Sequence, residues 1–445
     1  MKTTILMLGG GYTTVYAYKS LERKLSGKLK NGEVEILVVA PNKYHSFHGF
    51  CGEVIAGLLP VEATLTPLNK IMKHATFVDG WVECIDTKEQ SATVKLVSNN
   101  QSLVFRYDEL VIGVGMKDNE ETITGLKEFG HGVKNDGALA TCRKKIIMSL
   151  EAASKISSPE LRKKYMTFVI AGAGPAGVEF CTNLSEFIHV AGKKFRALKN
   201  DRPEIVLVHS GGEPMPAFSI GKGKLIRYCT SQLKKFGVRF ITNTKVVEVT
   251  KEGAMLSDNT FISANTVVSI IGQKNISIIG MKEFSDKKSK RITVTSFLNT
   301  ESAGNIWAGG DAAHVMHISG KFACPPNALW AIKHGELIGN NIADKLKEKK
   351  LGKFTYNNLG QAASFGVGNA VGELYGIELT GWLPWIMRMI VFLRFMPLRS
   401  GAINAGSRLV RSMIMGRIIP QIALSGSMSG ETRVFGDENK VFNLI

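Results

Sequence analysis

The stretch Phe168-Val-Ile-Ala-Gly172-Ala-Gly174-Pro-Ala-Gly177-Val-Glu179-Phe180 decides the fold. Four apolar residues run into three glycines at the spacing G-x-G-x-x-G, and apolar residues at helical spacing follow. This order predicts a strand, a tight turn and a helix. The first glycine allows the turn, the second lets the backbone approach a diphosphate, and the third lets helix and strand pack closely. The pattern therefore predicts a dinucleotide site at a helix N-terminus, formed by Gly172, Gly174, Pro175, Ala176 and Gly177.

A second glycine turn lies near the start of the chain. An apolar strand over 5–8 runs into Gly9, Gly10, Gly11 and Tyr12. Thr14 stands where the pattern has its third glycine, so we expect this helix and strand to lie slightly further apart than usual. The helix is predicted over 14–29 and the next parallel strand over 34–40.

The strand over 34–40 lacks an acidic residue at its end. A ribose-binding fold normally places Asp or Glu there to accept hydroxyl hydrogens. This chain has Ala40-Pro41-Asn42-Lys43 instead. We therefore expect an adenosine ribose to be held by the backbone at Ala40, by Asn42 or by Lys43. We expect this binding to be weaker than, or different from, binding by a carboxylate.

Composition limits the class of protein. A chain of 445 residues predicts two or three domains, and its aliphatic, glycine-rich composition is typical of an α/β enzyme. The six cysteines lie far apart without metal-ligand spacing, which argues against zinc and a secreted disulfide framework. The short apolar start predicts a strand and no secretory signal. The net charge of +18 suggests nucleic acid or an anionic membrane as a partner.

The middle of the chain predicts the remainder of both sheets. Residues 42–57 indicate a loop leading into a helix, and short alternating strands over 76–105, which include Val82, predict a β-meander. A buried strand then ends in Gly113. After the central glycine turn we expect a helix to about Leu198, and a strand that ends at His209, again without an acid. The absence of this carboxylate removes one discrimination against NADPH.

The order of these parts resembles the flavoproteins with two dinucleotide-binding domains, and most closely type II NADH dehydrogenases. The resemblance is carried by Gly9-Gly10-Gly11, Tyr44-His45-Ser46-Phe47, Gly113-Val114-Gly115, the stretch from Gly172 to Glu179, and Gly309-Gly310-Asp311. It implies an α/β fold of two Rossmann-like, glutathione-reductase-like domains. It also implies FAD at the first turn and NADH or NADPH at the second.

The resemblance suggests domain boundaries and further site residues. We predict an FAD-binding domain at 1–118 and 299–370, an NAD(P)H-binding domain at 119–298, and a C-terminal membrane-association region at 371–445. The cofactor site is expected to include Val82, Gly113, Gly272, Asp311 and Ala328. Glu179 is expected near the nicotinamide and flavin, although a carboxylate in the first turn of a helix is also favoured by the helix dipole.

Two positions depart from the family pattern. Type II dehydrogenases usually carry two glutamines in the helix after Pro325-Pro326, where quinone and nicotinamide meet. Leu329 and Lys333 stand there in this chain. We predict that Lys333 donates a hydrogen bond to quinone or flavin, and the change of residues leaves the identity of the electron acceptor open.

The tail over 381–420 has six arginines and no acidic residue. Its apolar runs are too short to span a bilayer, which takes about 20 residues. Arginines alternate with apolar residues and tryptophans, which is typical of a helix lying in a membrane interface. The alternative is a helix packed on the body with a solvated arginine face. No interleaved lysines and aromatics point to nucleic acid.

The resemblance and the composition of the tail together imply a peripheral membrane enzyme at the cytoplasmic face, which passes electrons from NAD(P)H through FAD to a quinone. A homodimer is compatible with this prediction, and no metal site is expected. Cysteine-dependent chemistry at Cys51 or Cys324, as in single-cysteine oxidases or sulfide:quinone oxidoreductases, is one alternative. A degenerate flavoprotein that serves as a membrane-docked scaffold or redox sensor is another, because Thr14, Ala40 and His209 all depart from the binding pattern.

Overall fold

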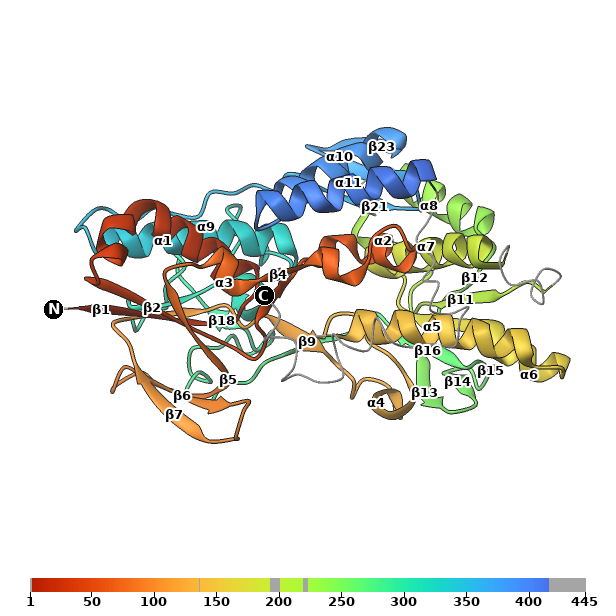
Figure 1. Cartoon of the computed structure of the whole chain (residues 1–445), viewed down its shortest axis with the longest axis horizontal. Coiled ribbons are helices and arrows are strands. Elements are labelled where there is room, and N and C mark those ends of the chain that lie inside the picture. Colours follow the sequence, from red (N-terminus) through yellow and green to blue (C-terminus); the bar gives the residue numbers. More distant parts are fainter. Residues whose placement is uncertain (1, 136, 193–200, 219–222, 416–445) are drawn as a thin grey trace.

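Two β-sheets built around parallel strands, with helices on their faces, form the body of the molecule, and a C-terminal layer lies across both (Figure 1). The computed structural model describes residues 2–135, 137–192, 201–218 and 223–415. The α/β fold expected from the two glycine turns is confirmed.

The first sheet has seven strands in the order β19-β8-β1-β2-β5-β6-β7. Their bounds are β1 (Thr3–Leu8), β2 (Val34–Ala40), β5 (Ala75–Asp86), β6 (Ser91–Leu96), β7 (Ser102–Arg106), β8 (Glu109–Ile112) and β19 (Ile306–Ala308). Strand β5 pairs parallel with β2 and then continues into an antiparallel ladder with β6 and β7. The predicted meander is therefore present, and its first strand belongs to the parallel sheet.

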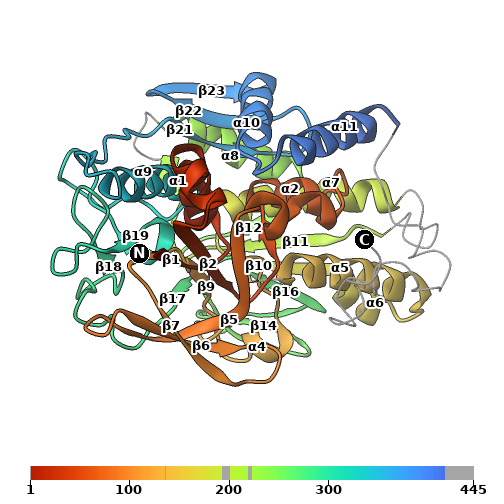
Figure 2. The ribbon, with the colours of Figure 1, turned by 60° about the vertical axis from the view of Figure 1, so that its left-hand side comes forward.

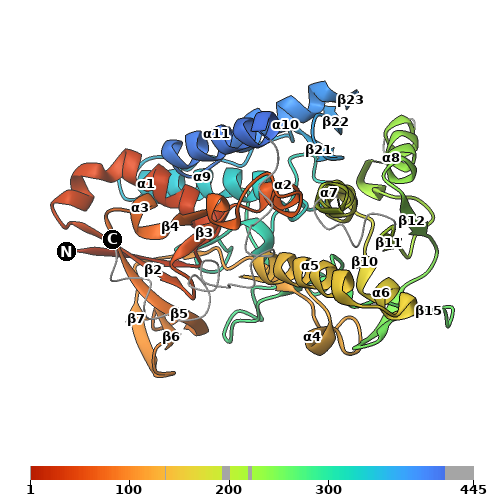
Figure 3. The same cartoon turned by 45° about the vertical axis from the view of Figure 1, so that its right-hand side comes forward.

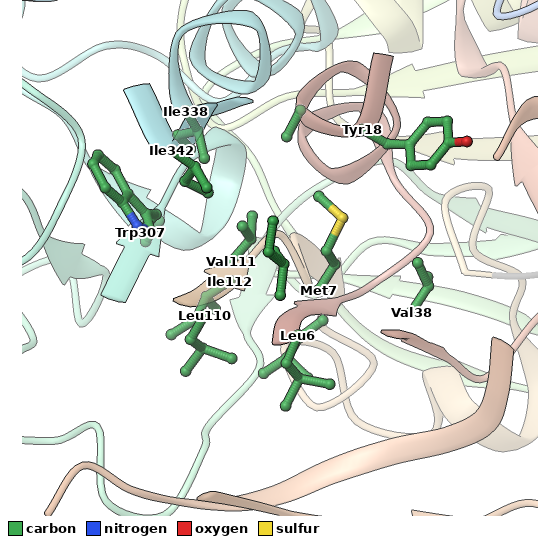
Figure 4. Close-up of a cluster of buried hydrophobic side chains, with 14 of the residues drawn as sticks. Leu6, Met7, Tyr18, Val38, Leu110, Val111, Ile112, Trp307, Ile338 and Ile342 are labelled. Carbon is green, nitrogen blue, oxygen red and sulfur yellow. The ribbon is translucent and has the colours of Figure 1, made fainter. Parts of the chain in front are cut away.

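Strands β1 and β8 lie in the interior of this sheet and carry an almost continuous apolar sequence, as strands covered on both faces do. Helices α1 (Tyr12–Lys30) and α9 (Ala328–Lys345) cover one face (Figure 2). Figure 4 shows Met7, Ile112, Trp307 and Ile338 meeting in the core between sheet and helices. The indole N–H of Trp307 donates to the buried carboxylate of Glu109 at 2.7 Å, so this core contains a satisfied polar pair.

Helices α1 and α9 touch through their backbones. Gly335 and Gly339 of α9 lie against the carbonyl groups of Thr13 and Ala17 in α1, where an added Cβ would overlap backbone atoms. This close approach fixes where both helices begin. Both N-termini lie at the carboxyl end of the first sheet, which is the end at which ligands bind in such folds.

The second sheet has the order β12-β11-β10-β16, and all its strands are parallel. Its elements are β10 (Thr167–Ala171), β11 (Glu204–Val208), β12 (Val238–Ile241), β16 (Thr266–Ser269), α5 (Ala138–Lys155), α6 (Pro159–Met166), α7 (Pro175–Gly192) and α8 (Lys224–Lys235). A small antiparallel sheet follows β12, formed by β13 (Val246–Thr250), β14 (Gly253–Leu256) and β15 (Phe261–Ser263). The predicted helix end near Leu198 lies outside the described residues.

The chain rejoins the first core earlier than the predicted boundary at residue 299. Ile278, Met281 and Ile292 are buried in the same core as β1 and α9. The backbone N–H of Ile85 in β5 also donates to Ile279 O at 2.9 Å. By packing, the stretch from about residue 278 therefore belongs with the first sheet. The domain boundaries remain a prediction.

A C-terminal layer lies over both sheets (Figure 3). It consists of an antiparallel sheet and two helices: β21 (Gly360–Ser364), β22 (Ala370–Leu374), β23 (Ile377–Gly381), α10 (Trp382–Arg394) and α11 (Arg399–Met415). One side of α10 is buried through Trp385, Arg388 and Met389. In the described part of the chain, no helix has the length and apolar content needed to cross a bilayer.

The remaining short elements surround the first sheet and its connection to the second. They are β3 (Tyr44–Ser46), β4 (Leu65–Pro67), β9 (Met116–Asp118), β17 (Gln273–Asn275), β18 (Ile292–Thr293), β20 (Ala313–His314), α2 (Cys51–Ile55), α3 (Leu68–Ile71) and α4 (Leu126–Phe129). Strands β9 and β17 pair with each other. They thereby link the two chain segments that connect the first sheet to the second. Helix α2 lies beside α7 of the second sheet (Figure 3).

We expect Gly339→Ala to destabilise the first domain by about 1–3 kcal/mol, because its Cβ would overlap the Ala17 carbonyl of α1. The matched control is Gly27→Ala, since Gly27 is an exposed glycine of α1 with open space around it. Alanine there should be neutral or stabilising by up to about 1 kcal/mol. Denaturant unfolding measures both, and equal midpoints for the two variants would contradict the proposed helix contact.

Candidate active site

A cavity of about 690 Å³ lies where the carboxyl ends of both sheets meet. This volume is within the range of about 300–1,000 Å³ that is usual for ligand and cofactor pockets. Of the predicted site residues, thirteen line it: Gly9, Gly10, Gly11, Tyr12, Ala40, Asn42, Val82, Gly113, Ala176, Glu179, Gly272, Asp311 and Ala328. The structure thus brings residues from 9 to 328 together around one space.

The first glycine turn forms one wall of the cavity. Gly9 has φ +101°, and an added Cβ would lie 2.6 Å from Gly113 O. The first N–H groups of an α-helix have no intrahelical acceptor. At the start of α1 no side chain of Gly11 caps them either. Such a turn and helix start suit a diphosphate, and the residues present therefore fit an FAD molecule at this wall.

His45 supports this turn from behind. Its ring Nδ1 lies 3.1 Å from Gly10 O, and because a carbonyl oxygen only accepts, Nδ1 is the donor. Burial lowers the pKa of His45 to about 4, so the ring is neutral near pH 7. His45 therefore has a structural role at this turn.

Thr14 is accommodated in the first turn beside Gly113. Its side chain is fully buried, with Oγ1 3.5 Å from Leu8 O and next to Gly113. The missing side chain at Gly113 leaves room for the threonine. Thr14 does not line the cavity, whereas its neighbour Thr13 does, and Thr13 Oγ1 donates to Ala331 O at 3.4 Å. Thr13 was not predicted from sequence.

Asp311 follows β19 and points into the cavity wall, where Lys134 meets it. The Lys134 ammonium lies 2.7 Å from Asp311 Oδ2, and both side chains are largely shielded from solvent. Asp118 holds the Lys134 segment, because its Oδ2 accepts the backbone N–H groups of Val133, Lys134 and Asn135 at 2.9–3.2 Å. Lys134 lies 177 residues from Asp311 in a segment without a motif, so sequence patterns gave no signal for it.

The N-terminus of α9 faces the cavity, as its proline-containing entry predicts. Asn327 caps the helix by accepting the N–H of Trp330 at 3.1 Å, and Ala328 and Ala331 line the cavity. Lys333 does not reach it. The Lys333 ammonium instead pairs with Glu336 one turn further along the helix at 2.8 Å.

The geometry therefore gives no support to the predicted hydrogen bond from Lys333 to quinone or flavin. Leu329 is also absent from the described residues that line the cavity. The reason is helical spacing, because α9 shows the cavity only the face that carries Ala328 and Ala331. The roles predicted for Leu329 and Lys333 remain predictions.

The second glycine turn shapes its helix beside the cavity. Gly172 has φ +107°, and Gly177 packs so closely on the Gly172 carbonyl that an added Cβ would overlap it. Gly174 has open space around it. Gly172, Gly174, Pro175 and Gly177 do not themselves line the cavity, whereas Ala176 does.

Two predicted ribose contacts lie away from the cavity lining. His209 directly follows β11, and its Nδ1 accepts the N–H of Ala173 at 3.4 Å. The Lys43 ammonium lies 3.1 Å from Asp79 at the surface. Neither residue is among the described residues that line the cavity, so their roles in ribose binding remain predictions.

Glu179 belongs to a buried charge cluster. Arg388 Nε of α10 lies 3.1 Å from Glu179 Oε1, and Arg388 Nη1 lies 2.6 Å from Oε1 of Glu53 in α2. The N–H of Ser364 donates to Glu179 at 2.6 Å. Burial raises the pKa of Glu179, while Arg388 lowers it and Glu53 raises it. Only Glu179 was predicted from sequence as a site residue.

The cysteine residues are poorly suited to thiolate chemistry. Burial raises the pKa of Cys51, which lines the cavity, to about 12, and that of Cys324 to about 11. Both thiols are therefore protonated near neutral pH, and the protonated form is a weak nucleophile. Within the described ranges, His, Cys, Asp and Glu side chains form no group of three that could hold a metal ion.

The cavity is lined by the first glycine turn, by the first turns of α7 after the second glycine turn, and by the start of α9. This arrangement defines the class: an oxidoreductase fold with two nucleotide-binding units. Residues 3–335 match the family model described as pyridine nucleotide-disulphide oxidoreductase, and the chain belongs to this family. It is 26% identical over 394 residues to a protein named type II NADH:quinone oxidoreductase from Staphylococcus haemolyticus strain JCSC1435, across 87% of this chain and 93% of that protein. A protein of the same name from Staphylococcus aureus strain NCTC 8325 is 25% identical, with the same coverage.

A solved structure of NDH2 from Plasmodium falciparum in complex with NADH shares the fold. The TM-score is 0.84 at 16% identity, covering 94% of this chain and 99% of that one. The family and fold class expected from the order of the motifs are confirmed, and so is the prediction of an enzyme.

We expect Lys134→Met to weaken FAD retention by about 10–100-fold, because it leaves the shielded Asp311 carboxylate without its cation. Lys127→Met is the matched control, since it removes the same charge from an exposed position on α4. The rise of flavin fluorescence on dilution measures release. Equal release from both variants would remove Lys134 from the cofactor site.

Proposed function

We propose that this chain transfers two electrons from NADH to a membrane quinone through a bound FAD. The supporting observation is the single cavity lined by the first glycine turn and by Ala176 and Glu179 of the helix after the second. The named relatives are NADH:quinone oxidoreductases. When bound, FAD supplies the two-electron chemistry that links a nicotinamide to a quinone.

The protein contributes positioning and electrostatics to this reaction. The N-termini of α1 and α9 direct positive helix ends at the cavity, where they favour a diphosphate and the negative charge of a reduced ring. Lys134 orients Asp311. Glu179 is an acidic group of the cavity lining on α7, and Gly272, with φ +70°, lets a nucleotide pass close to the backbone.

The choice between NADH and NADPH depends on the end of β11. His209 stands there in place of an acid, and burial lowers its pKa, so it is neutral near pH 7. A neutral residue neither binds the ribose hydroxyls as a carboxylate does nor repels a 2′-phosphate. We propose NADH as the principal donor, with weak discrimination against NADPH.

The C-terminal helices carry an exposed apolar surface. We define the apolar strip as the exposed residues Trp382, Leu383, Ile386 and Ile390 of α10 with Ile403, Val410, Met413 and Ile414 of α11. Patches of this kind on amphipathic helices are typical of proteins that lie on a membrane. We propose that the strip binds the membrane surface from which the quinone comes. The side of the membrane remains a prediction.

The arginines of this region divide into two groups. Arg388 is buried in the ion cluster, so the expectation that it faces lipid is wrong. Arg394, Arg408 and Arg411 are exposed and suit an anionic lipid surface. Arg417 lies outside the described residues.

Addition of NADH to the FAD-loaded protein should bleach the flavin absorbance, and a soluble quinone should restore it. Gly174→Glu tests the nucleotide site, because Gly174 has room for a side chain that would then obstruct and repel the diphosphate. We expect this variant to keep FAD and to lose bleaching by NADH at least tenfold, whereas Gly174→Ala loses less. If NADH does not bleach the loaded protein, the proposed function is wrong.

Membrane binding should depend on the apolar strip. Ile390 and Ile414 are 62% and 79% exposed, and glutamate at both positions should lower binding to vesicles of anionic phospholipid by about tenfold or more. Val104→Glu is the matched control, because Val104 is 65% exposed on β7, away from the C-terminal layer. Co-sedimentation measures binding. Unchanged binding of the double variant would exclude the strip as the docking surface.

A further inference from the structure

Helix α10 has an exposed apolar face and a buried face that carries a charged residue. Ile386 and Ile390 are exposed in the apolar strip, whereas Arg388 between them is buried with a side chain that is 1% exposed. A buried guanidinium is costly unless charged and polar partners surround it. Its partners come from segments of the chain that lie far from α10 in sequence.

Arg388 connects three parts of the structure. Besides Glu53 and Glu179, its Nη2 donates to Gly49 O at 2.9 Å, and the guanidinium lies 4.3 Å from the centre of the Phe392 ring. Glu53 lies on α2 beside the first domain, and Glu179 lies on α7 of the second. One side chain of the C-terminal layer therefore holds both domains at the cavity wall.

Apolar packing shields this cluster from water. Phe47, Phe50 and Val54 form a small core with Trp385 and Met389 of α10. Gly49 lies against the rings of Phe47 and Phe392 without room for a side chain. Charges in such surroundings interact strongly, because few water molecules screen them.

The cluster contains more acidic groups than basic ones. Two carboxylates share one guanidinium, and Glu179 alone of the three opens into the cavity. From the elements packed against it, Glu179 faces Arg388 of α10, Glu53 of α2 and the N–H of Ser364 in β21. The Cys51 thiol also lies near the cluster, and burial keeps it protonated.

We infer that Arg388 is a positioning residue that couples the surface helix α10 to the active site by fixing the orientation and charge of Glu179. Arg388 favours the ionised form of Glu179, and Glu53 opposes it. The balance between these two neighbours sets the pH at which Glu179 takes up a proton beside the cavity. A shift of α10 at the membrane is thereby transmitted to the acidic group at the cavity wall. The membrane part of this inference rests on the proposed function.

The test titrates Glu179 directly in the FAD-loaded protein, without NADH or quinone. The infrared band of its protonated carboxyl group is identified by its loss in Glu179→Gln. We expect Arg388→Met to raise the apparent pKa of Glu179 by about 1–3, and Glu53→Gln to lower it. The apparent pKa of Glu179 in the double variant Arg388→Met/Glu53→Gln should lie between the values of the two single variants. Arg388→Lys should restore most of the original value.

Arg394→Met is the matched control, because Arg394 is an exposed arginine on the same helix. It should leave the apparent pKa of Glu179 unchanged. Hydrogen exchange of α10 should increase in Arg388→Met and stay unchanged in Arg394→Met. The inference would be overturned if Arg388→Met and Glu53→Gln shifted the apparent pKa of Glu179 in the same direction, or if neither shifted it. Because the titration needs no substrate, failure of the quinone reaction is a separate result.

Discussion

Close contact between backbones, at positions where a side chain would not fit, is the constraint on which this site depends. Gly9 lies against Gly113, Gly177 lies against Gly172, and the glycines of α9 lie against α1. Each contact fixes the start of a helix relative to a strand or to another helix. The N-termini of α1 and α9 and the first turns of α7 therefore meet around one cavity, where their unpaired N–H groups favour anionic ligands.

The parts of the site that sequence could predict are those set by local backbone chemistry. Glycines that need positive φ, as Gly9, Gly172 and Gly272 do, leave a recognisable spacing beside an apolar strand. The same holds for Asp311 at a strand end and for the capped start of α9. The expectation of two nucleotide-binding domains with parallel sheets followed from these turns, because ligands bind at the carboxyl ends of such strands.

The parts that sequence could not predict depend on which face of an element turns inward, or on contacts across the chain. Lys134 and Thr13 carry no pattern, and tertiary packing alone places them at the cavity. Lys333 was expected at the site, yet helical spacing turns it toward Glu336. Arg388 was grouped with the other arginines of a basic amphipathic stretch, since the sequence does not show that two distant carboxylates meet it.

The cavity combines groups that suit a diphosphate with a buried acidic group, and this combination suits a two-electron reaction between a nucleotide and a quinone. The first glycine turn and the helix N-termini present N–H groups that favour a diphosphate, and Lys134 pairs there with Asp311. The cavity lining also includes Glu179, within a cluster of two carboxylates and one guanidinium. A reduced quinone must gain protons as well as electrons, and burial raises the pKa of Glu179, which lines the cavity. The buried Arg388 limits how far that pKa rises, so one ion cluster both joins the domains and tunes the acid.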